Sequence, residues 1–236
     1  MTRLVVLADP DEVASRAALE IARLAGHAAC DRGAFRLALS GGTTPRAAYE
    51  RLARLGLDWS QIHAFFGDER AVPADDPDSN FRMAREALFD RVAIPSANVH
   101  RMRGEAEDLD AAARAYEAEL PDALDLALLG MGEDGHTASL FPGSTAIDEA
   151  VRKVLPVVGP KPPPRRLTLT MPVLRAARER IVLVTGAGKA SVLARVLTGP
   201  LALAELPVQV ARDGLFLVDR AAAQALPRDW LEAHAT

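Results

Sequence analysis

The stretch DLALLGMGEDGHTASLFPGS, residues 125–144, joins a run of apolar residues to a cluster of glycines, acids and a histidine. Residues 126–129 are continuously apolar, which is typical of a strand that is buried on both faces of a parallel sheet. Glycine, glutamate, aspartate and histidine then fill six of the seven positions from 130 to 136. A turn needs only one or two residues of these types. The excess indicates a functional loop at the carboxyl end of a buried strand.

The same alternation of short apolar runs and helical patterns extends outward from this stretch in both directions. We expect strands over residues 3–8, 35–40, 62–67, 124–129, 166–171, 180–186 and 214–219. The apolar spacing predicts helices over residues 11–30, 45–55, 79–90, 108–120 and 189–197. Such alternation predicts an α/β fold with a mostly parallel central sheet and helices on both faces. The proline-dense segment 159–166 reads as a loop inside a single domain that covers residues 1–236.

The composition is that of an ordinary globular protein. The chain has 236 residues, of which 49% are apolar and 25% charged, and its net charge is −4. A nucleic-acid binder would carry a basic surplus, and a membrane span needs about 20 consecutive apolar residues. Only five consecutive apolar residues precede Asp9, too few for a signal peptide, and Cys30 is the single cysteine. These features predict a cytoplasmic protein with no nucleic-acid or membrane partner.

Polar clusters also follow other predicted strands, at SGGTTP (40–45), GDER (67–70) and TGAGK (185–189). Because the carboxyl ends of parallel strands meet at one edge of a sheet, these loops are expected to form one site. Gly41, Gly42 and Thr43 precede a helix that is expected to begin at Pro45. Glycines let backbone N–H groups approach an anion, and a helix N-terminus adds partial positive charge. A tight turn capped by a threonine is the alternative interpretation.

Two cationic side chains stand where they could meet an anion. Lys189 begins a predicted helix directly after a strand, in a chain that contains 25 arginines but only three lysines. Its compact charge suits a phosphate, although a surface lysine is the alternative. Arg70 could bind a phosphate or carboxylate with two N–H groups while Asp68 holds it in place. The alternative for GDER is a solvated charged loop. Asn80 is weighed as a further site residue, but a capped helix explains its segment.

His136 is the strongest candidate for a reactive group, because it follows Asp134 and Gly135 at the end of a strand. No H-x-x-x-H or C-x-x-C spacing accompanies it, so a metal site is not expected. The G-x-S-x-G pattern of a nucleophilic serine is also missing. An isolated imidazole on a loop suits the role of general acid or base.

Five segments together resemble the 6-phosphogluconolactonase family: SGGTTP, FFGDERAVPADDPDSN, LLGMGEDGHTASLFPG, PPPRRLTLTMPVL and LVTGAGKA. They occur in the family's order over roughly residues 37–190. The resemblance implies a modified Rossmann-like fold, shared with glucosamine-6-phosphate deaminases and ribose-5-phosphate isomerases. It implies hydrolysis of 6-phospho-D-glucono-1,5-lactone to 6-phosphogluconate in the oxidative pentose phosphate pathway, without metal or organic cofactor. The expected partner is therefore a small sugar-phosphate lactone, bound by a monomer, although the sequence leaves the oligomeric state open.

The resemblance also implies roles for individual residues. His136 would take the proton of the attacking water, with Asp134 shaping its position, while backbone N–H groups of the glycine-rich segments stabilise the oxyanion. The remote phosphate would be held by a set of residues that comprises Gly41, Gly42, Thr43, Asp68, Arg70, Arg166 and Lys189. Arg166 is chosen over Arg165 because the family places an arginine of the site directly before LTLT. Adjacent residues of a strand face opposite sides, so Arg165 is expected in solvent.

Two other functions remain as alternatives. A glucosamine-6-phosphate deaminase typically continues after its Asp-Gly-His with IAFNEPG, where this chain has TASLFPG, and it favours tyrosine at the position of Arg70. Both differences favour the lactonase. A non-catalytic sugar-phosphate sensor would usually carry a DNA-binding helix-turn-helix module. The first strand is expected at about residue 3, which leaves no room for one.

Overall fold

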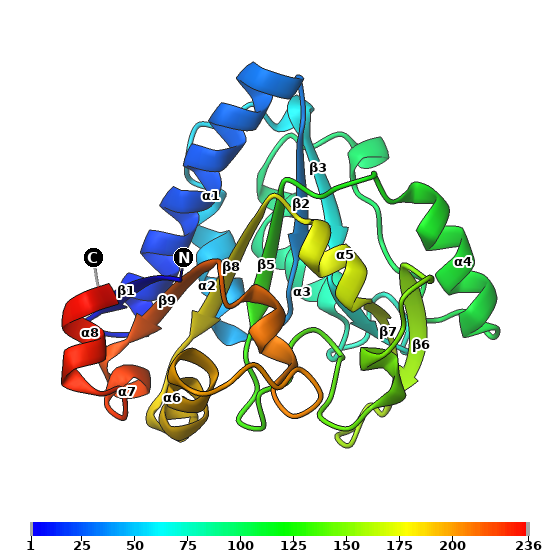
Figure 1. Ribbon diagram of the computed structural model, residues 1–236. Coiled ribbons are helices and arrows are strands. Elements are labelled where there is room, and N and C mark those ends of the chain that lie inside the picture. The colour runs from blue at the N-terminus through cyan, green and yellow to red at the C-terminus, as the bar shows by residue number, and fades with distance from the viewer. Residues whose placement is uncertain (1, 235–236) are drawn as a thin grey trace.

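A six-stranded parallel sheet forms the centre of the computed structural model, which describes residues 2–234 (Figure 1). Its strands lie in the order β1-β9-β8-β5-β2-β3. Their bounds are β1 (Arg3–Leu7), β2 (Phe35–Leu39), β3 (Ile62–Phe66), β5 (Leu126–Gly130), β8 (Glu179–Val184) and β9 (Leu215–Asp219). A second sheet is antiparallel and has the order β4-β7-β6, formed by β4 (Asp68–Arg70), β6 (Val154–Val158) and β7 (Arg165–Leu169).

Helices cover both faces of the large sheet, as predicted. They are α1 (Pro10–Arg32), α2 (Thr43–Leu52), α3 (Asn80–Ala87), α4 (Leu109–Glu119), α5 (Met171–Ala176), α6 (Ala190–Thr198), α7 (Arg220–Ala223) and α8 (Arg228–His234). Short 3₁₀ helices lie at Trp59–Gln61, Phe89–Arg91, Ser96–Asn98, Thr145–Ile147, Ala187–Lys189 and Pro207–Ala211. In the view of Figure 1, α1 and α2 lie behind the sheet and α5 and α6 in front. None of the helices in residues 2–234 is long and apolar enough to cross a bilayer.

The strand that precedes the glycine-rich loop lies in the middle of the large sheet. β5 pairs with β8 on one side and β2 on the other, and residues 126–129 are at most 1% exposed. A strand covered on both faces and on both edges has no solvent-facing side, which is why its sequence does not alternate. The loop that follows β5 therefore lies at the centre of one edge of the sheet.

The small antiparallel sheet was not anticipated as a separate layer. The segment expected as a strand over 166–171 is β7 and pairs with β4 and β6 instead of joining the parallel sheet. GDER, interpreted as a loop, contains the three-residue strand β4, which is too short to show an alternating pattern. β6 went unrecognised because Pro156 interrupts it. Since β6 is an edge strand, it tolerates a residue that donates no N–H.

Several helix starts differ from expectation by a residue or two, and one difference matters for function. The helix expected from Pro45 begins at Thr43, with Gly42 as its N-cap at φ 111°. A side chain at residue 42 would be strained at this φ. The first N–H groups of α2 therefore belong to Thr43 and its neighbour, and no side chain caps them. Asp9 caps α1 and Ser79 caps α3 through their side chains.

Candidate active site

A pocket of about 390 Å³ opens where the loops after β2, β3, β5 and β8 meet the small sheet. Most of the predicted site residues line it: Gly41, Gly42, Thr43, Asp68, Arg70, His136, Arg166 and Lys189. Asp134 does not line the pocket but is hydrogen-bonded to His136. Three cationic side chains and one carboxylate thus share this pocket in a chain whose net charge is −4. This local excess of positive charge suits an anionic ligand.

Asp134 and His136 form a tightly connected pair in the loop after β5. One oxygen, Oδ1 of Asp134, accepts from the backbone N–H of His136 at 3.1 Å and contacts Nδ1 of its ring. Burial raises the pKa of Asp134, but the hydrogen bonds from His136 outweigh it and hold that pKa below its ordinary value. An ionised carboxylate can only accept, so Nδ1 is the nitrogen that donates. Nε2 then keeps its lone pair in the neutral ring and can act as a base.

Glycine at position 132 is required by this pair. A Cβ there would lie 2.1 Å from Nδ1 of His136 and 2.5 Å from Oδ1 of Asp134. The Gly132 N–H also donates to the carbonyl of His136 at 2.9 Å, which closes the loop on itself. The sequence cluster is therefore a folded turn whose missing side chain makes room for the imidazole.

The start of α2 supplies uncapped backbone donors beside the cations. Pocket-lining residues 41–44 precede or begin this helix. The hydroxyls of Thr44 and Thr185 lie 2.8 Å apart and join the loops after β2 and β8. Uncapped N–H groups at a helix N-terminus bind anions such as phosphate. Thr185 was not singled out from the sequence, where only its place at the start of TGAGK could have indicated it.

Arg70 is held through both its side chain and its backbone. Its Nη1 donates to the carbonyl of Asp78 at 2.6 Å, and its backbone N–H donates to Glu69 at 2.7 Å. Its Nε is buried without a hydrogen-bond partner among the described residues. The same Glu69 carboxylate accepts from the backbone N–H groups of Asn80 and Phe81 at 2.8 Å each. Glu69 therefore ties β4, which carries Arg70, to the beginning of α3.

Asp68 does not pair directly with Arg70, contrary to the expectation that it holds the arginine. Its Oδ2 accepts from the hydroxyl of Ser139 at 2.6 Å, and its Oδ1 accepts from Nδ2 of Asn80 at 3.2 Å. Because Asp68 is only 6% exposed, these bonds compensate for the burial of its charge. Asn80 is also buried and lies outside the pocket lining, so its role is to hold Asp68 and not to face the ligand.

Arg166 is 7% exposed and braced by the proline-rich loop. Its Nε donates to the carbonyl of Pro163 at 3.1 Å and its Nη2 to that of Lys161 at 3.2 Å. Burial lowers the pKa of Arg166, while Asp68 acts in the opposite direction. Its sequence neighbour Arg165 is exposed and lines a different pocket, as expected for adjacent residues of a strand.

Lys189 ends the 3₁₀ turn after β8 and is half-buried. Burial lowers its pKa, and the nearby carboxylates of Glu133 and Asp219 act in the opposite direction. Asp219 is 2% exposed and accepts from the N–H of Gly186 through both oxygens, at 3.1 and 3.0 Å. It thereby fixes the turn that carries Lys189.

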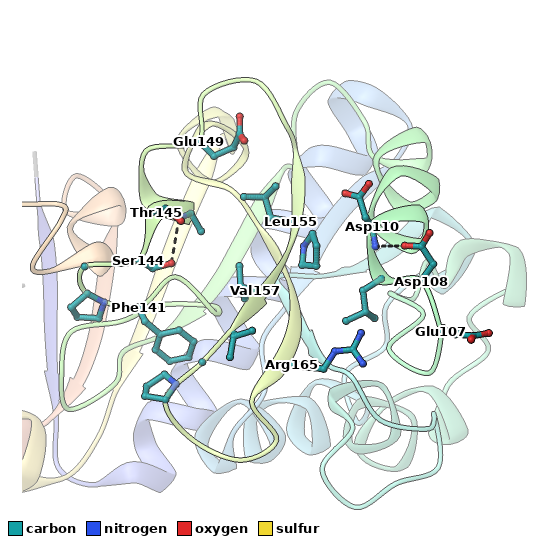
Figure 2. A pocket seen from close by; sticks show the side chains of 18 residues that line it. Glu107, Asp108, Asp110, Phe141, Ser144, Thr145, Glu149, Leu155, Val157 and Arg165 are labelled. Atoms are coloured by element: carbon teal, nitrogen blue, oxygen red, sulfur yellow. Dashed lines mark hydrogen bonds between the residues drawn. The ribbon is translucent and has the colours of Figure 1, made fainter.

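A larger pocket of about 1440 Å³ lies beside this site, between the start of α4, β6 and the loop that begins at Phe141 (Figure 2). Its lining includes Glu107, Asp108, Asp110 and Glu149, and among the described residues that line it Arg165 is the one cation. An anionic substrate would be repelled there, so the smaller pocket is the candidate active site. Within residues 2–234, no group of three or more histidine, cysteine or acidic side chains is arranged to hold a metal ion.

Comparisons with known proteins agree with this geometry. Residues 8–217 match the family described as glucosamine-6-phosphate isomerases/6-phosphogluconolactonase. A 6-phosphogluconolactonase of Synechocystis is 42% identical over 212 residues, which are 84% of this chain and 88% of the relative. That of Mycobacterium tuberculosis is 39% identical, covering 94% and 97%. The solved structure of 6-phosphogluconolactonase from Trypanosoma brucei superposes with a TM-score of 0.84 at 32% identity, over 96% of this chain and 99% of that one.

Proposed function

This chain belongs to the glucosamine-6-phosphate isomerase/6-phosphogluconolactonase family and is an enzyme of the 6-phosphogluconolactonase type; we propose that His136 is the general base of its reaction. The substrate would be 6-phospho-D-glucono-1,5-lactone and the product 6-phosphogluconate. This reaction would place the enzyme in the oxidative pentose phosphate pathway. The relatives named above carry the lactonase name, which favours this substrate over glucosamine 6-phosphate.

The chemistry follows from the state of the imidazole. A δ-lactone is an activated ester, so water can attack its carbonyl carbon once a base removes a proton. Nε2 of His136 would take that proton while Asp134 stabilises the imidazolium that forms. The bond between the carbonyl carbon and the ring oxygen then breaks, and the imidazolium of His136 returns its proton to the ring oxygen, which becomes the C5 hydroxyl. The charge on the carbonyl oxygen develops beside a glycine-rich loop whose backbone N–H groups can stabilise it.

The phosphate would act as the anchor. It lies at C6, remote from the reacting carbon, so its contacts orient the lactone without taking part in bond making. Arg70, Arg166 and Lys189 line the pocket with the uncapped start of α2, and together they match a dianion. Gly41, Gly42 and Thr43 would contribute backbone and hydroxyl donors.

The observation that carries the proposal is the position of the Asp134–His136 pair at a pocket lined by three cations. To test it, the lactone is generated in situ with glucose-6-phosphate dehydrogenase, and its disappearance is compared with the spontaneous rate. We expect the purified protein to accelerate the loss. An unchanged rate, together with ammonia release from glucosamine 6-phosphate, would overturn the assignment.

A further inference from the structure

The ring of Phe141 touches two residues that the proposed function places at opposite ends of the substrate. Its centroid lies 4.7 Å from that of the His136 imidazole, with 44° between the ring planes. The guanidinium carbon of Arg166 lies over the same ring, 5.5 Å from its centroid. Phe141 is 6% exposed and comes from the loop after β5, whereas Arg166 comes from β7. One side chain thus contacts the base and a phosphate-binding cation.

Hydrogen bonds alone leave the orientation of both side chains incompletely fixed. The imidazole of His136 is held at Nδ1 by Asp134, which still permits the ring to tilt about that bond. Arg166 is held by the carbonyls of Pro163 and Lys161, which lie on a loop and not on the sheet. A rigid aromatic surface restricts the tilt of a neighbouring ring and attracts a cation over its face.

Phe141 is itself tightly seated. A Cβ on Gly159 would lie 2.7 Å from Cε2 and 2.9 Å from Cζ of the ring, so the ring edge rests directly on the backbone of the proline-rich loop. Phe141 also lines the larger pocket beside the active site, where Figure 2 shows its ring. The ring therefore stands between the two pockets, with backbone at its edge and the functional side chains against it.

We propose that Phe141 is a positioning residue that sets the imidazole of His136 and the guanidinium of Arg166 in one fixed relationship. The inference rests on the proposed function, in which these groups meet the carbonyl end and the phosphate end of one lactone. A six-carbon substrate has a fixed span, so both groups must be correctly placed at once. A displacement of about 1 Å can cost about 100-fold in rate.

The test uses Phe141→Leu, which keeps an apolar side chain but removes the flat ring. We expect kcat to fall about tenfold and the Kd for 6-phosphogluconate to rise about fivefold or more, since both contacts of the ring are lost. The NMR resonance of the His136 ring, assigned by its absence in His136→Asn, should move because the ring current of Phe141 disappears. A role in stability alone would lower Tm and leave kcat and Kd unchanged in the folded protein.

A second variant displaces the ring without removing it. Gly159→Ala adds a Cβ that would meet the edge of the Phe141 ring and would also lie 3.3 Å from Nε of Arg166, so it should change kcat and Kd in the same direction as the leucine variant. If Phe141→Leu does not fold, Phe141→Met is measured with the same expectations. Phe89→Leu is the matched control: this ring packs against Phe66 and Phe81, away from the pocket, and its loss should lower stability only.

The proposal is overturned if folded Phe141→Leu keeps both kcat and Kd within about twofold of the wild type, or if only one of them changes. The NMR measurement does not depend on catalysis, so it distinguishes a failure of this proposal from a failure of the proposed function. If the wild type does not hydrolyse the lactone, the proposed function is wrong. An unmoved His136 resonance in Phe141→Leu would show instead that the ring does not position the imidazole.

Discussion

A single carboxylate oxygen of Asp134 contacts both the backbone N–H and the ring Nδ1 of His136. The two residues are separated only by Gly135, so the turn itself brings them together. This arrangement selects the tautomer in which Nε2 carries the lone pair, and it holds a negative charge beside the ring. This arrangement leads to a prediction of how kcat changes when the charge of Asp134 is removed.

Asp134→Asn should lower kcat about 10- to 100-fold, because a hydrogen bond to a charged group contributes about 1.5–3 kcal/mol and each 1.36 kcal/mol is tenfold in rate. Asparagine keeps the shape but cannot balance the imidazolium. The measurement is kcat at saturating lactone, corrected for spontaneous hydrolysis. Asp148→Asn, an exposed acid further along the same loop, is the control. Equal rates for Asp134→Asn and wild type would show that the charge is not used.

Glu69→Gln should destabilise the fold by about 1–3 kcal/mol, the range for a buried polar group left without a partner. Glu69 is 3% exposed and accepts from three backbone N–H groups and the hydroxyl of Ser79. The amide N–H₂ of glutamine would face a donor. Urea unfolding measures the loss. Glu86→Gln, at a partly exposed position of α3, should change little. A stability equal to wild type would mean that the carboxylate is not needed there.

Activity should survive exhaustive treatment with EDTA. No third metal ligand joins Asp134 and His136 within the described residues, and the proposed chemistry needs only a base and fixed cations. The rate of lactone loss is measured before and after chelation. Inactivation by EDTA, followed by recovery with one divalent ion, would show that the site works through a metal.

Lys189→Ala and Arg166→Ala should weaken binding of 6-phosphogluconate about 10- to 100-fold and affect kcat less. Their charges act on a phosphate that does not react, so they contribute similarly to ground and transition states. Calorimetry gives Kd and the lactone assay gives kcat. Lys153→Ala and Arg165→Ala are matched controls outside the lining of the smaller pocket. A variant that binds product as wild type does would exclude that residue as a phosphate ligand.

The pH dependence of product binding distinguishes the contribution of Lys189 from that of Arg166. Burial lowers the pKa of Lys189. The free enzyme therefore loses this charge at a lower pH than an ordinary lysine, whose pKa is about 10.4. Affinity should be full below the Lys189 pKa and decline as pH rises through it. Lys189→Ala should lack this alkaline decline. If the decline persists in the variant, another group causes it.

The parallel sheet and the position of the candidate pocket could be predicted because both depend on local patterns. The apolar run 126–129 indicates a strand covered on both faces, and the polar loops follow the strands at one edge of the parallel sheet. The small sheet could not be predicted in the same way. β4 is three residues long, and β6 contains Pro156, so neither shows a strand pattern by itself. Each is stabilised by pairing with β7, a contact between distant parts of the chain.

The contacts that support the site residues could not be predicted from the sequence either. Asp68 was expected to hold Arg70, but it bonds with Ser139 and Asn80, which lie 71 and 12 residues away along the chain. Phe141 follows His136 by five residues in an ordinary apolar context. Only the fold brings Arg166 over its ring. Residue types identify groups that can react, whereas the groups that orient them depend on tertiary packing.

His136→Asn should reduce kcat about 10²- to 10⁴-fold, the usual contribution of a general base, while the Kd for 6-phosphogluconate stays near the wild-type value. Asparagine has a similar polar shape but cannot accept the proton of water. A rate that depends on a general base falls in acid, so kcat of the wild type should show an acid limb that disappears in the variant together with most of the rate. The profile must be measured at saturating lactone, because the second ionisation of a phosphate monoester lies near pH 6 and alters binding in kcat/KM. A variant with wild-type kcat would place the base elsewhere and leave His136 as a packing residue against Phe141.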